Sequence, residues 1–306
     1  MSRKKKRRKS QPIGLYVAII VFFVAIALLE AFLRRPRDNS YTYNQTYEKP
    51  TTEKSSEFVE LYNALEIPLC GATHKQNDHE VRCFQNYTIC YRESYEQAEW
   101  SAYCLSASQL SRNSERTNDF RPDNMISTGS ASLDDYKGSG YDRGHLTPAA
   151  DMAFNKNAMS ETFFMSNMSP QDPQFNRGVW MYLEGQVRDW VKRFGRVYVI
   201  SGPILEKSSN EYKRIGQNYV AVPDFYYKVI LVPLYADKED YKSMDTSSSV
   251  MTIGFIIPNH KSDKVYWNYA VTIDEVEKRT GLDFFSLLED DIENEVEASF
   301  NIDNWK

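Results

Sequence analysis

One histidine, two asparagines and one glutamate in the middle of the chain could together do chemistry. His145 ends the run DRGH at 142–145, Asn167 and Asn176 follow in turn-rich stretches, and Glu184 comes eight residues after Asn176. Zinc takes three or four His, Cys, Asp or Glu ligands, so this set is a poor zinc site. Mg²⁺ prefers oxygen, keeps most of its waters and needs only one or two protein oxygens beside substrate phosphates.

A histidine that binds no metal can act as a general base near neutral pH, although a lone histidine in a loop is usually structural. The set therefore predicts metal-assisted phosphodiester hydrolysis, in which His145 deprotonates water while Mg²⁺ stabilises charge at phosphorus and at the leaving oxygen. Ser-His-Asp hydrolysis is the alternative, with Ser166 or Ser201 as nucleophile. It is poorly supported because the chain has no G-x-S-x-G motif.

The elements that must position these side chains can be read from periodicity. An amphipathic helix is predicted over 178–194, with Trp180, Leu183, Val187 and Val191 on its apolar face, and it would carry Glu184. Strands are predicted over 86–91, 100–105, 196–201, 225–235 and 250–257. A further helix over 273–280 would end at Gly281. Because strands and helices interleave without a βαβ rhythm, the pattern favours a mixed α+β domain.

The charge of the chain is unevenly distributed. Residues 1–37 hold ten Lys or Arg and one Glu, which leaves 27 basic and 41 acidic residues, a net charge of −14, for the remainder. An acidic domain gains no long-range attraction to polyanions, so any grip on nucleic acid must come from a local basic groove. This balance disfavours a passive nucleic-acid binder more than an enzyme that needs a few phosphate contacts.

The N-terminal region predicts a membrane anchor. Residues 1–12 form a basic tail, 13–33 an apolar span, 34–56 a polar linker, and 57–306 the functional domain. As a helix, residues 13–33 would be about 31 Å long, which matches a hydrocarbon core of ~30 Å. The basic tail predicts a cytoplasmic N-terminus and an extracytoplasmic domain. One alternative is secretion after signal cleavage at an A-x-A-like site, residues 25–27. Another is nuclear or nucleic-acid targeting by the basic run.

Four cysteines, Cys70, Cys83, Cys90 and Cys104, lie within 35 positions, and the sequence contains no others. Because no C-x-x-C pair is present and the domain is predicted to lie outside the cytoplasm, we expect two disulfides rather than a zinc site. A hairpin of the strands at 86–91 and 100–105 would pair Cys90 with Cys104 and leave Cys70 with Cys83. Reduced, buried thiols are the alternative.

The central stretches resemble a known family. SGYDRGHLTPAADM, SNMSPQ and FNRGVWMYLE are similar to motifs of the DNA/RNA non-specific endonucleases, an endonuclease G-like group built on a ββα-metal (His-Me) finger. ERTNDFRPD, the SGP turn at 201–203, IIPN at 256–259 and IDEVEKRTGLDFF at 273–285 follow in the family's order, so the resemblance covers about residues 58–286. It implies a central, mostly antiparallel sheet flanked by helices.

The resemblance also implies roles for single residues. His145 matches the general base, and Asn176 matches the one protein ligand of Mg²⁺, with Mn²⁺ as an alternative ion. Glu184 matches the acid that holds metal-bound water; its eight-residue spacing from Asn176 places both on one helix face. Asn167 matches the asparagine that supports the site.

Three arginines are the candidates for substrate binding. Arg116 resembles the phosphate-contacting arginine of the family, and Arg121 is its close competitor. Asp142 and Arg143 belong to the signature, where Arg143 is a candidate for binding substrate and Asp142 for ordering the site.

The combined prediction is a membrane-anchored, extracytoplasmic, Mg²⁺-dependent, sugar-non-specific endonuclease. Its partners would be DNA, RNA and the lipid bilayer, with a second copy of the chain as an option, since members of the family often dimerise. The alternative is a non-catalytic, surface-tethered protein that captures nucleic acid and has kept the nuclease fold. The apolar span and the cysteine-rich segment are departures from the family's core pattern. The uniformly apolar span argues against a mitochondrial transit peptide.

Overall fold

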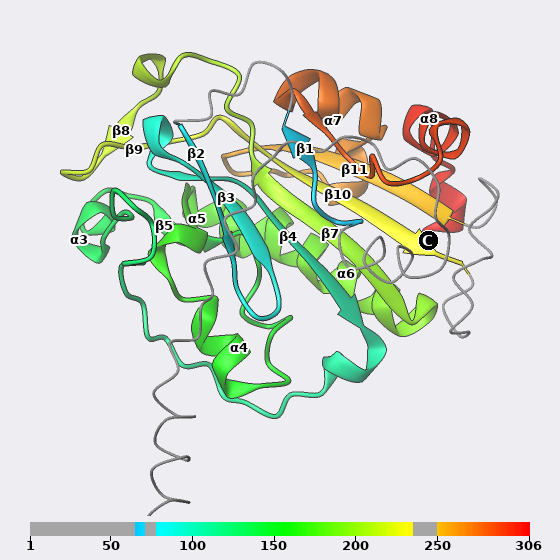
Figure 1. Ribbon diagram of the computed structural model, residues 1–306, viewed down its shortest axis with the longest axis horizontal. Coiled ribbons are helices and arrows are strands. Elements are labelled where there is room, and N and C mark those ends of the chain that lie inside the picture. The colour runs from blue at the N-terminus through cyan, green and yellow to red at the C-terminus, as the bar shows by residue number, and fades with distance from the viewer. Residues whose placement is uncertain (1–64, 71–77, 235–249) are drawn as a thin grey trace, which may run out of the picture. The chain divides into compact units, whose positions relative to one another are not determined.

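The computed structural model describes residues 65–70, 78–234 and 250–306. In this part of the chain, a seven-stranded sheet is ordered β12-β11-β10-β7-β4-β3-β2, and each neighbouring pair is antiparallel (Figure 1). The predicted α+β class with a mostly antiparallel sheet is confirmed. The strands of this sheet are β2 His79–Cys83, β3 Thr88–Arg92, β4 Gln97–Ser106, β7 Arg196–Pro203, β10 Phe225–Pro233, β11 Val250–Pro258 and β12 Ala270–Val271.

The central strand β10 reads FYYKVILVP, and every residue after Phe225 is buried. Alternate side chains of a strand point to opposite faces, and both faces of this strand are covered. Tyr226 and Ile230 join one hydrophobic cluster, whereas Tyr227 and Val229 join the other. A strand with two covered faces needs apolar residues at nearly every position, which makes the charged Lys228 within it exceptional.

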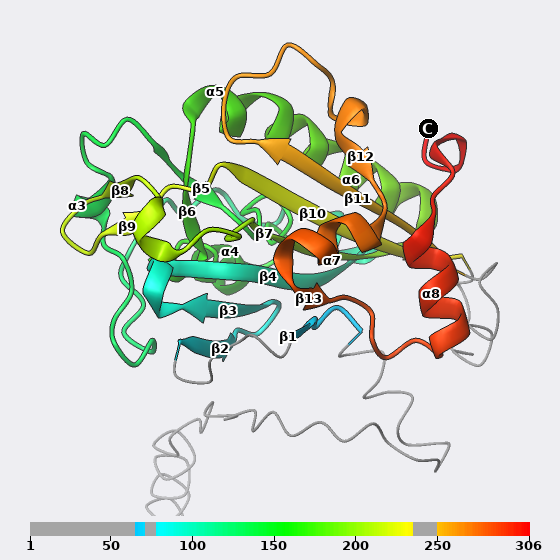
Figure 2. The same ribbon diagram turned by 90° about the horizontal axis from the view of Figure 1, so that it is seen from above.

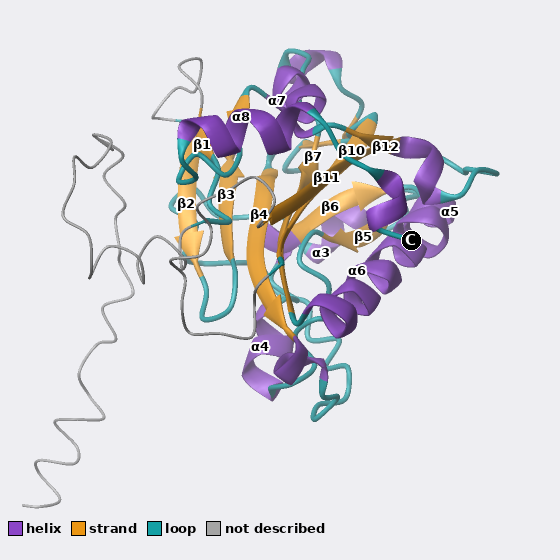
Figure 3. Ribbon diagram, turned by 90° about the vertical axis from the view of Figure 1, so that its right-hand side faces the viewer, coloured by secondary structure: helices purple, strands orange, loops and turns teal. Residues whose placement is uncertain are grey.

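Helix α6, Met181–Phe194, covers the first face of the sheet (Figures 2 and 3). The predicted apolar positions of this helix, Trp180, Leu183, Val187 and Val191, are all buried in one cluster. Gly195 ends the helix at φ 84°, a conformation that costs glycine little. We call this side of the sheet the α6 face.

Helices α7, Ile273–Thr280, and α8, Asp290–Ala298, cover the opposite face (Figures 2 and 3). The bounds predicted for α7 are confirmed: the Thr272 side chain caps its first turn, and Gly281 ends it in the left-handed region. Val276 of α7 and Val296 of α8 belong to the second hydrophobic cluster. We call this side the α7–α8 face.

Shorter elements complete the domain. Two strand pairs, β5–β6 and β8–β9, lie outside the main sheet, and β1 pairs with β13. The strands are β1 Leu69–Cys70, β5 Asp142–His145, β6 Met168–Gln171, β8 Arg214–Ile215, β9 Val220–Ala221 and β13 Leu282–Asp283. The short α-helices are α3 Leu133–Tyr136, α4 Lys156–Glu161 and α5 Pro173–Phe175. The 3₁₀ turns are η1 Glu93–Tyr95, η2 Ala107–Leu110, η3 Met165–Asn167, η5 Ser209–Glu211, η8 Tyr266–Tyr269 and η9 Ile302–Asn304, and η4 Asn176–Trp180 is a π-helix.

The predicted pairing of the cysteines is wrong. Cys83 and Cys104 are free thiols, so neither the Cys70–Cys83 nor the Cys90–Cys104 disulfide is present. The hairpin itself forms, but β4 begins at Gln97, closer to the turn than predicted. Its register therefore places Cys90 opposite Trp100, while Cys104 lies further along β4.

The predicted basic tail, apolar span and polar linker, residues 1–56, lie outside the described residues. Within the described ranges, no helix has the length and apolar character needed to cross a membrane.

Candidate active site

The β5–β6 hairpin positions His145 at the end of β5. In its register Asp142 lies opposite Gln171 and His145 opposite Met168. Gly144 is required between them, because a Cβ there would lie 2.1 Å from Cδ of Gln171. The glycine of the DRGH run thus lets β6 pack directly on the strand that carries the histidine.

His145 lies in an aromatic cage with only 9% of its surface exposed. The ring of Phe163 stands perpendicular to the imidazole at a centroid distance of 4.9 Å, and Phe120 lies at 5.8 Å. Burial, followed by the charges of Arg116 and Arg143, lowers the pKa of His145 from 6.5 to about 3. The imidazole is therefore neutral at neutral pH, and its buried Nε2 has no hydrogen-bond partner among the described residues. A neutral nitrogen without a donor can accept a proton.

The side-chain amide of Asn167 forms hydrogen bonds with the backbone around this hairpin. It is completely buried. Its Nδ2 donates to the carbonyls of Thr147 and Thr162, at 3.0 and 2.9 Å, and its Oδ1 accepts from the amide of Thr147 at 2.9 Å. Both sides of the amide are thus used within the protein. Asn167, predicted as a catalytic residue that supports the site, bonds to the chain that follows His145.

Asn176 begins the π-helix between α5 and α6, a local form that is often found at functional sites. Gly178 lies inside this turn with φ −111° and ψ −118°, outside the helical region. The Nδ2 group of Asn176 donates to Oδ2 of Asp142 at 2.9 Å. The Arg177 guanidinium donates two hydrogen bonds to the same carboxylate, at 2.6 and 2.8 Å. Asp142 therefore fixes the orientation of the Asn176 amide and leaves Oδ1 as its acceptor atom.

Glu184 follows two turns later in the first turn of α6 and is half-buried on the α6 face. Burial raises its pKa from 4.5 to about 7, the charge of Lys228 acts in the opposite direction, and Asp151 adds to the rise. Arg188 and Arg116 also favour the ionised form. The carboxyl group is thus balanced between its two protonation states near neutral pH.

Sequence reasoning missed the buried charges behind Glu184. Lys228 is fully buried in β10, where its Nζ donates to Oγ of Ser201 at 2.5 Å and lies 4.5 Å from the Trp180 ring. Asp151 accepts bonds from Tyr103 at 2.6 Å and from Arg188 at 2.7 Å. A lysine inside an apolar strand is the signal that could have revealed this network, because lysine is almost never fully buried without a partner.

The three candidate arginines differ in the number of contacts that their guanidinium groups make within the protein. Arg116 is exposed, with one hydrogen bond to Asn118 at 2.9 Å and its guanidinium 4.8 Å from the Phe163 ring. Arg143 stacks on Phe120 at 4.0 Å. Both of these rings belong to the cage of His145, so Arg116 and Arg143 flank the imidazole.

The guanidinium group of Arg121 already binds other groups of the protein. Its Nη1 donates to the Asp119 carboxylate at 2.8 Å and to the Ser160 carbonyl at 3.0 Å, and the guanidinium stacks on Phe164 at 3.9 Å. Arg121 therefore has more partners within the described part of the protein than Arg116 has.

The oxygen donors fit a hard cation. They are Oδ1 of Asn176, oriented by Asp142, and the carboxylate of Glu184. In the described part of the chain, none of these residues belongs to a close group of three or more His, Cys, Asp or Glu side chains. Such a donor set suits Mg²⁺, which keeps several waters, and does not suit zinc.

Comparisons with known proteins show to which family the chain belongs. A model of the family described as DNA/RNA non-specific endonuclease matches residues 68–291. The chain is 35% identical to the mitochondrial nuclease EXOG of Xenopus laevis over 81% of this chain and 68% of that protein. It is 38% identical to nuclease C1 of Cunninghamella echinulata var. echinulata, over 67% of this chain and 82% of that protein.

A solved structure shares the fold. A chain in the crystal structure of the EndoG/EndoGI complex, which addresses the mechanism of EndoG inhibition, has a TM-score of 0.63 and 28% identity. The match covers 78% of this chain and 95% of that chain. The family match spans the β5–β6 hairpin and α6, and thus every candidate residue from Arg116 to Glu184. The chain belongs to the DNA/RNA non-specific endonuclease family.

Proposed function

We propose that this nuclease hydrolyses phosphodiester bonds of both DNA and RNA with His145 as general base and Mg²⁺ as cofactor. The observation that carries the proposal is the neutral, caged imidazole of His145, whose buried Nε2 has no partner among the described residues and which two arginines flank. Guanidinium groups favour a bound phosphate, and phosphate contacts carry no sequence information. Binding through phosphate contacts alone would not distinguish one base from another.

Each residue has a defined task in this proposal. Arg116 and Arg143 bind the scissile phosphate, and its negative charge offsets the two cations that hold the pKa of His145 low. His145 then takes the proton of the attacking water. Asn176 Oδ1, oriented by Asp142, would hold Mg²⁺, and Glu184 would hold its water ligands. The cation supplies stabilisation of the charge that develops on the phosphate and the leaving oxygen.

The test uses the full-length chain, purified in a mild detergent, with supercoiled plasmid and single-stranded RNA as substrates. Mg²⁺-dependent degradation of both is expected, and EDTA should abolish it. His145→Ala should lower the rate by ~10²–10⁴-fold, the usual contribution of general base catalysis. Mn²⁺ in place of Mg²⁺ checks the identity of the ion.

His260→Ala is the matched control, because His260 is exposed and its ring contacts only the neighbouring carbonyl of Lys261. It should cleave at the wild-type rate. A folded His145→Ala protein with normal activity would contradict the mechanism. Retention of labelled DNA on a filter in Mg²⁺ without any cleavage by the wild type would instead support the non-catalytic capture protein.

We also propose that residues 13–33 anchor the nuclease in a membrane with the domain on the extracytoplasmic side. The support is the length and apolar character of this span and the basic tail before it. Membranes washed with alkaline carbonate should retain the full chain, and external protease should digest the domain in spheroplasts or sealed cells. Release of the chain into the medium with a new N-terminus after residue 27 would show cleavage and secretion instead.

A further inference from the structure

Three carboxylates gather on the α7–α8 face, away from the α6 face that carries His145. Asp274 and Glu277 are one turn apart on α7, and Glu297 lies near the end of α8. One carboxylate oxygen from each residue lies within 4.8 Å of the other two. Side chains of equal charge at this separation repel one another unless something neutralises them.

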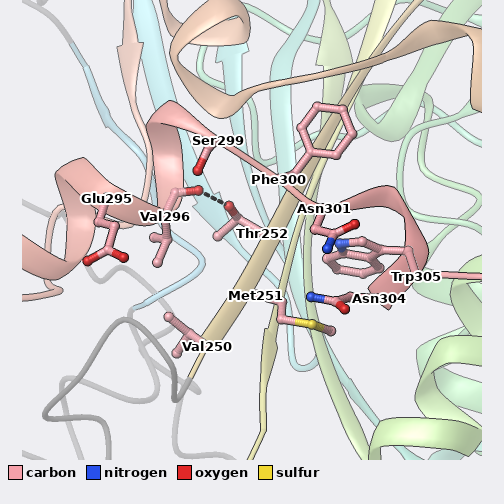
Figure 4. Close-up of a pocket in the computed structure, with 10 residues that line it drawn as sticks. All are labelled: Val250, Met251, Thr252, Glu295, Val296, Ser299, Phe300, Asn301, Asn304 and Trp305. Carbon is pink, nitrogen blue, oxygen red and sulfur yellow. Dashed lines mark hydrogen bonds between the residues drawn. The ribbon is translucent and has the colours of Figure 1, made fainter.

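Glu297 is a buried acid with one unpaired oxygen among the residues that the structure describes. Its residue surface is 6% exposed, and its Oε1 is buried without a hydrogen-bond partner among the described residues. The adjacent Val296 is buried and its carbonyl accepts a hydrogen bond from the Thr252 hydroxyl of β11, which holds this turn of α8 against the sheet (Figure 4). The backbone therefore keeps the carboxyl group of Glu297 near α7, although an unpaired buried carboxylate is costly.

The basic residues of α7 are engaged elsewhere. Lys278 reaches Glu275 at 3.5 Å, and Arg279 pairs with Glu206 at 2.5 Å. Burial raises the pKa of Glu297 to about 9, and the charges that add to this rise belong to acids alone: Glu277, Glu293, Asp283 and Asp274. The pKa of Glu277 is raised to about 7, also chiefly by burial. The group therefore needs positive charge from solution, as protons or as a cation.

We propose that Asp274, Glu277 and Glu297 form a binding site for a calcium-sized divalent cation that ties α8 to α7. Three oxygens within 4.8 Å of one another can bind a single ion. A set of three protein carboxylates suits Ca²⁺, which takes six to eight oxygen ligands in flexible geometry, better than Mg²⁺, which usually keeps several waters and binds one or two carboxylates. Asp274 is exposed, which gives the ion a path from solvent. The site is structural, and the proposal does not depend on the activity of the His145 site.

The test measures calcium binding and thermal unfolding of the full-length chain in detergent, first stripped with EDTA. Equilibrium dialysis with labelled calcium should show one more bound ion per chain in the wild type than in Glu297→Gln. A CaCl₂ concentration ~100 times Kd should raise the wild-type Tm by roughly 5–10 °C. MgCl₂ at the same concentration should raise it less.

Glu295→Gln is the matched control, because Glu295 is an exposed acid on α8, two residues before Glu297 and outside the cluster. It should keep the full calcium shift, and Glu297→Gln should lose it. Nuclease activity in Mg²⁺ should be unchanged in both variants, which separates this site from the catalytic one.

Asp274→Asn provides a second variant that does not disturb the core, since Asp274 is exposed. It should weaken calcium binding by at least tenfold even if Glu297→Gln fails to fold. The proposal is overturned if the stripped wild type binds no additional calcium. An equal calcium shift in wild type and Asp274→Asn would also overturn it.

Discussion

Both faces of the central sheet carry poorly solvated carboxylates, but the two faces differ in the charges that surround these carboxylates. On the α6 face, Glu184 and Asp151 share their surroundings with Lys228 and Arg188. On the α7–α8 face, the charges around Glu297 are all negative. The pKa of Glu184 is accordingly raised only to about 7, whereas that of Glu297 is raised to about 9.

This difference separates two uses of a buried acid. A carboxyl group near pKa 7 can be ionised when substrate arrives, and the cation that makes this possible is already part of the protein. A carboxyl group near pKa 9 stays protonated until an external cation displaces the proton. In the two proposals above, the α6 face accordingly serves the chemistry and the α7–α8 face binds an ion.

The largest expected effect comes from removing the cation of the α6 face. Lys228→Met should raise the pKa of Glu184 further, because the lysine charge favours the ionised carboxylate. Activity at pH 7 should fall, and the acid limb of the pH profile of kcat/KM should move to higher pH. Urea unfolding at pH 8 should show a loss of about 3 kcal/mol, typical of a buried charge that loses its partner.

Lys207→Met is the control, because Lys207 is an exposed lysine paired with Asp224 at the surface. It should leave both the pH profile and the stability nearly unchanged. An acid limb that stays in place in a folded Lys228→Met protein would show that Lys228 does not set the ionisation of Glu184.

A smaller loss is expected from Asp142→Asn, which removes the negative charge and one of the two acceptor oxygens that bind Asn176 and Arg177. A residue that orients a metal ligand typically contributes 10–100-fold to affinity or activity. The variant should therefore need more Mg²⁺ for half-maximal rate. Its Tm should change little, because Arg177, the other partner of Asp142, is 71% exposed and such pairs stabilise weakly.

Arg177→Gln breaks the exposed ion pair but keeps the bond between Asp142 and Asn176. Its Mg²⁺ titration should match the wild type within about twofold, the size of a weak surface pair. Equal losses in Asp142→Asn and Arg177→Gln would mean that the ion pair, and not the orientation of the amide, matters for activity.

Local patterns predicted much of the fold. The helix at 273–280 is confirmed at both ends, since a threonine cap and a left-handed glycine are local signals. The apolar face predicted for 178–194 is buried as expected. Asn176, however, begins a π-helix that precedes α6, and periodicity alone, which predicts a regular helix from residue 178, does not reveal it.

Features that depend on distant partners were not predictable. Lys228, Asp151 and Tyr103 come from separate parts of the chain, and only the tertiary fold brings them behind Glu184. The register of β3 with β4, which separates Cys90 from Cys104, depends on where the turn closes. Acidic residues dominate the chain after residue 288, and nothing in that pattern marks Glu297 as buried by the packing of α8 on β11.

The α7–α8 face predicts how the stability of the metal-free protein depends on pH. The pKa of Glu297 is higher in the folded than in the unfolded chain, so the folded state holds its proton between pH ~4.5 and ~9. Stability in EDTA should therefore fall as pH rises through this window. Glu297→Gln should remove part of this loss of stability, because glutamine carries no charge at any pH. At pH 9 its Tm should exceed that of the wild type by roughly 2–4 °C for each kcal/mol of electrostatic repulsion that the substitution removes.

Wild type and variant should converge below pH ~4, where the carboxyl group is mostly protonated in both the folded and the unfolded state. Glu295→Gln should follow the wild-type curve throughout, because that side chain is exposed. Parallel curves for wild type and Glu297→Gln between pH 5 and 9 would contradict a raised pKa for Glu297.

The smallest expected effect concerns Arg116, the weakest of the charges that favour ionisation of Glu184. Arg116→Ala should raise KM for plasmid by up to ~5-fold, since an exposed charge contact contributes roughly 0.2–1 kcal/mol. Because the guanidinium is screened by salt, the difference from wild type should shrink at higher ionic strength. The acid limb of kcat/KM should move less than in Lys228→Met.

Arg121→Ala removes a nearby residue of the same charge that should affect stability and not substrate binding. Its bonds to Asp119 and the Ser160 carbonyl and its stacking on Phe164 should make the variant lose Tm while KM stays near the wild-type value. If Arg121→Ala raised KM and Arg116→Ala did not, Arg121 would be the phosphate contact. The phosphate would then be bound by an arginine that does not contact the aromatic cage of His145. The positive charges that favour the ionised form of Glu184 would in that case be separate from the charge that binds substrate.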